Sequence, residues 1–153
     1  MRSRVIFIGA VETDANLFAV KALNDFPDLD LFATNDRNLA LREAEGAVAI
    51  VGHHFQFDDD LLTRTKHLRW IQSLTTGTDN ILRLSALRAE VTVTSTRGMH
   101  GPQMSELVFL QMLALLRDFP RMQRNQAAHA WQRWPQPLLA GKTMVIVGIG
   151  VSS

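Results

Sequence analysis

The sequence contains no cysteine and no tyrosine, and its acidic and basic residues nearly balance. The absence of cysteine excludes a disulfide framework, a thiol nucleophile and a cysteine metal site. The net charge of +1 gives no general reason for nucleic acid or a membrane surface as a partner. We therefore expect neither of these partners.

Long hydrophobic runs are missing as well. The longest apolar candidate, residues 107–116, is shorter than the ~20 residues that span a bilayer, and it contains Gln111. The first residues form a short apolar run with basic flanks, without the apolar stretch and cleavage site of a secretory signal. These features predict a cytoplasmic protein.

The residues that are present are typical of a globular protein. Hydrophobic residues make up 46% of the chain and charged residues 20%, which is enough apolar material to bury a core. A length of 153 residues allows one domain, or one small domain with part of another.

Apolar runs alternate with amphipathic segments up to residue 96, and Asp14 is placed to cap the first predicted helix. Such repeats predict an α/β fold, in which a doubly wound parallel sheet of flavodoxin-like order has helices on both faces. Ligands of such sheets bind at the carboxyl ends of the strands. The predicted strands are 5–8, 29–34, 47–51, 68–74 and 91–95, and the predicted helices are 14–26, 38–45, 58–66 and 80–88.

The pattern changes after residue 98. Residues 98–102 read as a flexible connection, and residues 103–119 as a long helix with little polar surface, which Pro120 ends. A polar stretch then leads to a β-branched run at 144–147, which predicts a strand. We expect one domain at 1–98 and the start of a second, incomplete domain at 99–153.

Gly148 and Gly150 follow this last predicted strand with the spacing of the first two glycines of a dinucleotide-binding turn. The third glycine position holds Ser153, so the pattern is weak on its own. An ordinary strand-to-turn glycine pair explains these residues equally well.

Several strand ends carry candidate ligand-binding residues. The turn at 75–78 has small side chains and accessible N–H groups that can hold a carboxylate, although a plain strand-ending turn fits too. His53 and His54 are neighbours on a predicted strand end and should point to opposite faces, which disfavours a shared metal site. We predict no metal site. Arg97 is either a contact for an anion or a solvated hinge charge.

Four pieces of the chain share their order and spacing with one enzyme family. They are residues 68–79 (LRWIQSLTTGTD), Ser105-Glu106-Leu107 at the start of the long helix, Trp131, and residues 139–150 (LAGKTMVIVGIG). From about residue 47 onward, the chain resembles the NAD-dependent D-isomer-specific 2-hydroxyacid dehydrogenases. The resemblance implies a Rossmann-type NAD-binding domain that begins with the long helix and the strand at 144–147.

The resemblance also implies site residues and partners. The substrate is a small 2-oxo or 2-hydroxy acid, the cofactor is NAD or NADP, and the protein is a homodimer. Substrate contacts would come from Thr76, Gly77, His54 and Arg97, and cofactor contacts from Gly148, Gly150, Val151 and Ser152. The family's catalytic arginine, histidine and carboxylate come later in the chain than Ser153, so we assign no catalytic residue.

The leading hypothesis is the N-terminal part of a hydride-transferring oxidoreductase that is inactive as this chain alone. The alternative is a non-catalytic flavodoxin-like module that binds a small anion or another subunit. A phosphoacceptor receiver domain is disfavoured because Gly9 and Ala10 stand where it needs an acidic pair. A flavodoxin is disfavoured because the chain lacks tyrosine and has acidic residues in the loop at 9–16.

Overall fold

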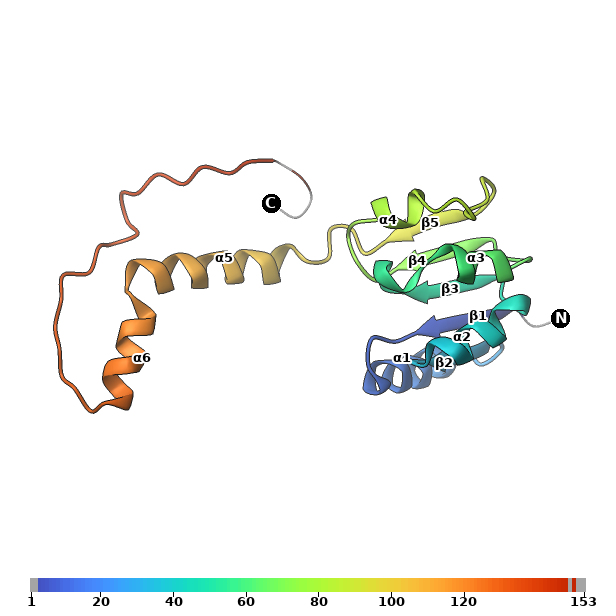
Figure 1. Ribbon diagram of the computed structural model, residues 1–153, viewed down its shortest axis with the longest axis horizontal. Helices are drawn as coiled ribbons and strands as arrows, with labels where there is room; N and C mark the ends of the chain where they lie inside the picture. Colours follow the sequence, from blue (N-terminus) through green and yellow to red (C-terminus); the bar gives the residue numbers. More distant parts are fainter. Residues whose placement is uncertain (1–2, 149, 151–153) are drawn as a thin grey trace. The chain divides into compact units, whose positions relative to one another are not determined.

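The computed structural model describes residues 3–148 and residue 150, without the side chains of residues 13–15. By its contacts the chain divides into two compact units, one ending at Arg97 and one beginning at Gly98. The first unit contains β1 (Arg4–Ile8), α1 (Glu12–Asp25), β2 (Asp30–Thr34), α2 (Arg37–Glu43), β3 (Ala49–Gly52), α3 (Asp59–Arg64), β4 (Trp70–Ser73), α4 (Asp79–Leu82) and β5 (Thr92–Ser95) (Figure 1). The second contains α5 (Gly101–Leu116) and α6 (Phe119–Ala127).

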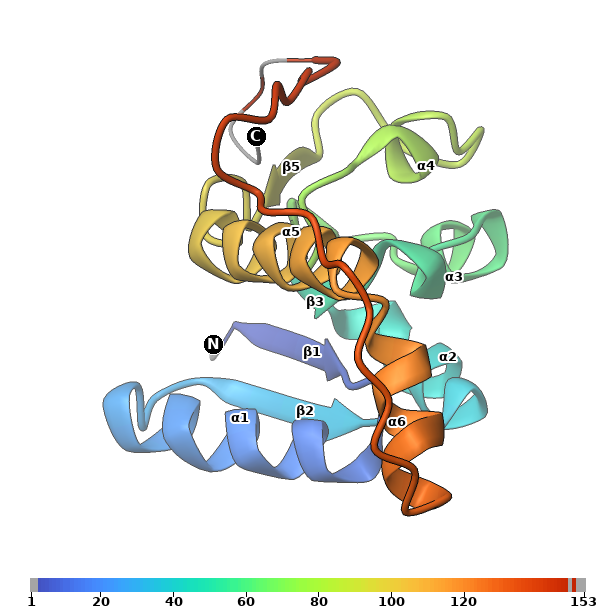
Figure 2. The same cartoon turned by 90° about the vertical axis from the view of Figure 1, so that its left-hand side faces the viewer.

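The first unit is built on a five-stranded sheet with the order β2-β1-β3-β4-β5. All neighbouring strands are parallel, and Ile50 of β3 pairs with Ile6 of β1 and Ile71 of β4. Figure 2 shows β1 and β2 running in the same direction beside α1. This is the flavodoxin-like order, so the predicted fold class is confirmed.

The main core lies on one face of the sheet. Alternate residues of the strands point to this face, where they meet apolar side chains from α2, α3 and α4. Burying each of these larger aliphatic side chains stabilises the fold by ~1.5–3 kcal/mol. The core includes Ile6, Ile8, Ala40, Ala44, Ile50, Leu61, Leu62, Leu68, Ile71 and Ile81.

The opposite face of the sheet is covered by a helix of this unit only at β1 and β2. There α1 packs on the strands, and the ring of Phe18 stacks on Phe7 with centroids 5.1 Å apart. On β4 and β5 the same face carries Trp70, which is 42% exposed, and Thr94, which accepts a hydrogen bond from the indole Nε1 of Trp70. Within the described part of this unit, helices therefore cover both faces for only part of the sheet.

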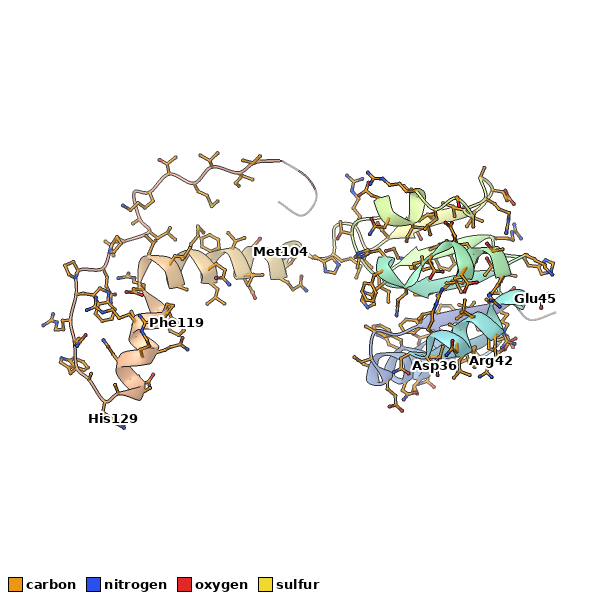
Figure 3. All side chains as sticks on the ribbon, viewed as in Figure 1. Asp36, Arg42, Glu45, Met104, Phe119 and His129 are labelled. Carbon is orange, nitrogen blue, oxygen red and sulfur yellow. The ribbon has the colours of Figure 1, made fainter. Side chains whose placement is uncertain are left out.

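All four predicted helices of this unit have different ends in the structure, and in two of them the difference has a clear cause. The first helix starts at Glu12 with Val11 as its N-cap, so the prediction that Asp14 caps it is wrong. The predicted helix 80–88 is only α4, because its later amides form tighter three-residue turns, as from Leu87 N–H to Leu84 O. At α2 the carboxylate of Asp36, labelled in Figure 3, accepts hydrogen bonds from the N–H groups of Asn38 and Leu39.

The second unit differs from the sequence prediction where α5 ends and α6 begins. The long helix ends at Leu116, and Pro120 lies in the first turn of α6, where its missing N–H breaks no helical hydrogen bond. Asp118, with φ of 50°, precedes this turn. In Figure 3 the labels Met104 and Phe119 mark α5 and the start of α6, and His129 follows α6.

The strand predicted at 144–147 is not formed. These residues run as extended chain without a strand assignment, and the Val147 side chain is 96% exposed. A strand needs a neighbouring strand to pair its N–H and C=O groups, and the described residues offer none here. No helix among them has the length and hydropathy required to cross a bilayer.

Candidate functional site

The carboxyl ends of β3 and β4 bring one predicted substrate contact, His54, close to the loop that carries two others, Thr76 and Gly77. Gly52 pairs with Ser73 at the end of these parallel strands, so the loops that follow adjoin. His54 lies in a 3-10 turn after β3, and its Nδ1 is 3.0 Å from the hydroxyl of Thr75 after β4. This pair forms the centre of the candidate site.

The Thr75 hydroxyl connects several groups of the β4 loop. It lies 2.9 Å from the hydroxyl of Ser73, whose side chain is buried, and it donates to the carbonyl of Gly77. The N–H of Leu74 donates to the carbonyl of Gly52 over 2.8 Å. These hydrogen bonds hold the loop in one conformation beside His54.

Thr76 and Gly77 occupy the outer part of the same loop. Thr76 is partly buried and Gly77 is exposed, and within the described residues their backbone N–H groups donate no hydrogen bond. Gly77 has no positive φ, and a Cβ there would meet no atom within 4 Å. Two unpaired N–H groups at an exposed turn can donate to a carboxylate.

The sequence predicted that His53 and His54 lie on a strand end, but the structure places both after the strand. β3 ends at Gly52, and His53 precedes the 3-10 turn His54–Gln56. Both imidazole rings contact Phe55, His53 stacked at 5.4 Å and His54 edge-on at 5.6 Å between centroids. The prediction that both residues lie on a strand end is therefore wrong, because they belong to a turn. Among the residues with described positions, no cluster of acidic and histidine side chains could hold a metal ion.

Gln56 is a residue of this edge that sequence reasoning missed. Its Nε2 donates to the carbonyl of Gly9 after β1 over 2.8 Å, and its Oε1 accepts from the N–H of His53 over 2.7 Å. The guanidinium of Arg37 donates to the carbonyl of Gln56 and pairs with Asp58. A glutamine in a loop gives no periodic pattern, so only the tertiary contacts reveal this role.

Arg97 is the last residue of the first unit and follows β5. Its side chain is exposed, and it forms no ion pair or hydrogen bond within the part of the chain that the structure describes. The structure thus places Arg97 after a strand end without linking it to His54 or Thr75.

Two carboxyl groups outside the candidate site, those of Glu45 and Glu90, have a lowered pKa. A hydrogen bond from Lys66 and its charge lower the pKa of Glu45, labelled in Figure 3 after α2. A backbone hydrogen bond and the Arg88 side chain lower the pKa of Glu90. Both carboxylates are exposed, so water and salt screen these interactions.

The predicted cofactor residues lie in the second unit. Gly148 is exposed and has φ of 93°, a left-handed conformation that suits the tight turn of a dinucleotide motif. Gly150 is also exposed, whereas Val151 and Ser152 lie outside the described residues. Since residues 144–147, directly before Gly148, form no strand, the described residues do not form a dinucleotide site as they stand.

Two solved structures resemble this chain over almost its full length. A D-isomer specific 2-hydroxyacid dehydrogenase family protein from Aeromonas salmonicida is 26% identical with a TM-score of 0.85, over 99% of this chain and 48% of that one. An NADPH-dependent glyoxylate/hydroxypyruvate reductase from Sinorhizobium meliloti, solved with NADP and sulfate, is 25% identical with a TM-score of 0.78, over 99% and 46%. The chain therefore spans about half the length of these structures.

A more distant neighbour shares the fold. It is a D-lactate dehydrogenase from Aquifex aeolicus, complexed with NAD and lactic acid, with 18% identity and a TM-score of 0.67 over 86% of this chain and 39% of that one. No curated protein sequence matches the chain. The family model for the catalytic domain of D-isomer specific 2-hydroxyacid dehydrogenases matches residues 6–141. With most of its length matched, the chain belongs to the D-isomer specific 2-hydroxyacid dehydrogenase family.

Proposed function

We propose that this chain is the N-terminal part of an oxidoreductase that transfers a hydride between NAD or NADP and a small D-2-hydroxy acid or 2-oxo acid. The observation that carries the proposal is the pair of unpaired N–H groups at Thr76 and Gly77, next to the His54–Thr75 contact. Family membership and the NADP and NAD complexes of the neighbours support the reaction class.

In this proposal residues 1–98 form the substrate-binding domain. The carboxylate of the acid accepts hydrogen bonds from the N–H groups of Thr76 and Gly77, each contributing ~1.5–3 kcal/mol because the acceptor is charged. His54 borders the site through its contact with Thr75 and shapes the space for the rest of the substrate. Arg97 is exposed and adds positive charge that attracts the anion.

Residues 99–153 form the start of the dinucleotide-binding domain in this proposal. The nicotinamide, when bound, carries the hydride. Gly148, Gly150, Val151 and Ser152 lie against the pyrophosphate once residues 144–147 pair with neighbouring strands. The proposal includes a cytoplasmic homodimer, supported by the cysteine-free composition and by the exposed apolar side chains of α5.

A titration of the amide NMR spectrum of this chain with glyoxylate tests the substrate site. We expect the largest shifts at Thr76 and Gly77, with smaller shifts at His54, because the carboxylate binds the free N–H groups. Glycolaldehyde, which lacks the carboxylate, serves as the control and should leave these amides unchanged. Shifts that cluster elsewhere, or equal shifts with glycolaldehyde, contradict the proposed site.

A further inference from the structure

We propose that Gln56 is a positioning residue. Its side-chain amide packs against Gly52 and holds His54 against Thr75. The importance of this contact for substrate binding rests on the function proposed above. The geometry itself does not, because it follows from contacts within the first unit alone.

The Gln56 side chain ties two loops together through main-chain atoms. Its Nε2 donates to the Gly9 carbonyl over 2.8 Å, and its Oε1 accepts from the His53 N–H over 2.7 Å. These bonds link the loop after β1 with the turn after β3. Because Gln56 is partly buried, breaking either bond leaves a polar group with reduced access to water.

Gly52 provides the space in which the amide sits. A Cβ at Gly52 would lie 2.9 Å from Oε1 of Gln56, closer than such atoms approach, and 3.5 Å from the side chain and carbonyl of Ile8. Gly52 has no positive φ, so the backbone conformation does not require glycine. The requirement is for space, and a methyl group at Gly52 must displace the Gln56 amide.

The opposite side of the turn is held by a charged side chain. Arg37 Nη1 donates to the carbonyl of Gln56 over 3.1 Å, and the same guanidinium pairs with Asp58. The residue between the two anchored positions, His54, lies 3.0 Å from Thr75 through its Nδ1. With its turn fixed on both sides, the imidazole is held in place before any ligand arrives.

The test uses three variants of the chain: Gln56→Met, which keeps the length of the side chain but removes its hydrogen bonds, Gly52→Ala, and the double variant. Gln123→Met, at an exposed position of α6, is the matched control. The readouts are the nuclear Overhauser effect between the His54 ring and the Thr75 methyl group, and glyoxylate affinity from amide shifts. Both single variants should lose most of the Overhauser effect and bind glyoxylate about tenfold more weakly.

The double variant distinguishes a positioning role of Gln56 from two independent effects of the substitutions on the fold. Since both substitutions act on one contact, the double variant should lose no more affinity than the worse single variant. Additive losses, or an unchanged Overhauser effect in a folded Gln56→Met, overturn the proposal. If Gln56→Met does not fold, Gln56→Glu replaces it. Glutamate keeps the acceptor for His53 but sets a carboxylate oxygen against the Gly9 carbonyl, so retention of the Overhauser effect there also overturns the proposal.

The two proposals fail in different ways. A parent chain that does not bind glyoxylate contradicts the proposed function, while loss of the Overhauser effect in the variants still supports positioning by Gln56. Glyoxylate binding that is unchanged in all variants, with the Overhauser effect retained, contradicts positioning and leaves the proposed function standing.

Discussion

At the scale of single residues, the Thr75 hydroxyl and the Gln56 amide organise the edge of the sheet without themselves being free to bind a ligand. Thr75 contacts His54, Ser73 and the carbonyl of Gly77, and Gln56 contacts Gly9 and His53. Among the described residues, the N–H groups of Thr76 and Gly77 donate no hydrogen bond and so remain available to a ligand. Substrate selection is therefore expected to depend on backbone groups, which substitutions affect only through steric access.

Replacement of Gly77 by valine tests this expectation in the complete dehydrogenase that we propose. The structure shows open space for a Cβ and no positive φ at Gly77, so stability should change by less than about 0.5 kcal/mol. The branched side chain should obstruct the carboxylate, raising KM for the oxo acid with cofactor affinity nearly unchanged. Steady-state kinetics and NAD titration measure both effects. A retained KM with lost NAD binding would assign the carboxylate to Arg97 or His54 instead.

At the scale of the elements, single aspartate and proline residues are typical of helix ends. Only the tertiary structure decides which of these residues lie at an end. Asp36 caps α2 with two hydrogen bonds, whereas Asp14 is not a cap, because α1 already starts at Glu12. Pro120 lies in the first turn of α6, where the sequence suggested only an end to the preceding helix. Proline fits both positions equally well, so the residue alone does not distinguish them.

The cap of α2 gives a prediction for one element. Asp36→Ala removes the acceptor for the N–H groups of Asn38 and Leu39, and should lower the free energy of unfolding by ~1 kcal/mol. Urea denaturation, followed through a spectroscopic signal of the first unit, measures this loss. Asp28→Ala is the control, because Asp28 is exposed and its side chain forms no hydrogen bond or ion pair among the described residues. An equal loss in both variants would show that the cap contributes nothing specific.

At the scale of the whole molecule, the second unit exposes much of its apolar surface. α5 has no buried residue, and Phe109, Leu110 and Leu115 are 53%, 63% and 81% exposed. A helix of this composition normally packs against another surface. Residues 144–147 are also apolar and exposed.

This exposed surface predicts that the 153-residue chain associates in solution. Sedimentation at micromolar concentration should show dimers or larger species. Leu110→Glu combined with Leu115→Glu should shift the chain toward monomer, because buried charges oppose the contact. Phe55→Glu, at an exposed residue of the first unit, is the control and should leave association unchanged. A monodisperse monomer of the parent chain refutes the prediction.

We further predict that this chain alone turns over no 2-hydroxy acid. Hydride transfer needs a held nicotinamide and an acid–base group near the substrate oxygen, and the described residues form no dinucleotide site. NADH or NADPH absorbance with glyoxylate or hydroxypyruvate should stay constant. Oxidation of either nucleotide above the rate without protein would refute this prediction.

The sequence alone was sufficient for the fold class, the strand order and the family. Alternating apolar runs identify strands and helices locally, and the right-handed crossover rule leaves few arrangements for them. The loop containing Thr76 and Gly77 could be selected from the sequence as a candidate, because it follows a predicted strand that forms as β4. Its contact with a substrate stays a prediction.

Only the tertiary structure decided which groups meet at the strand ends. The contact of His54 with Thr75, and that of Gln56 with Gly9, join residues far apart in the chain, and no local periodicity encodes such pairs. The run at 144–147 shows the same dependence. Its residues favour a strand, but strand formation requires hydrogen-bonding neighbours, which a local pattern cannot supply.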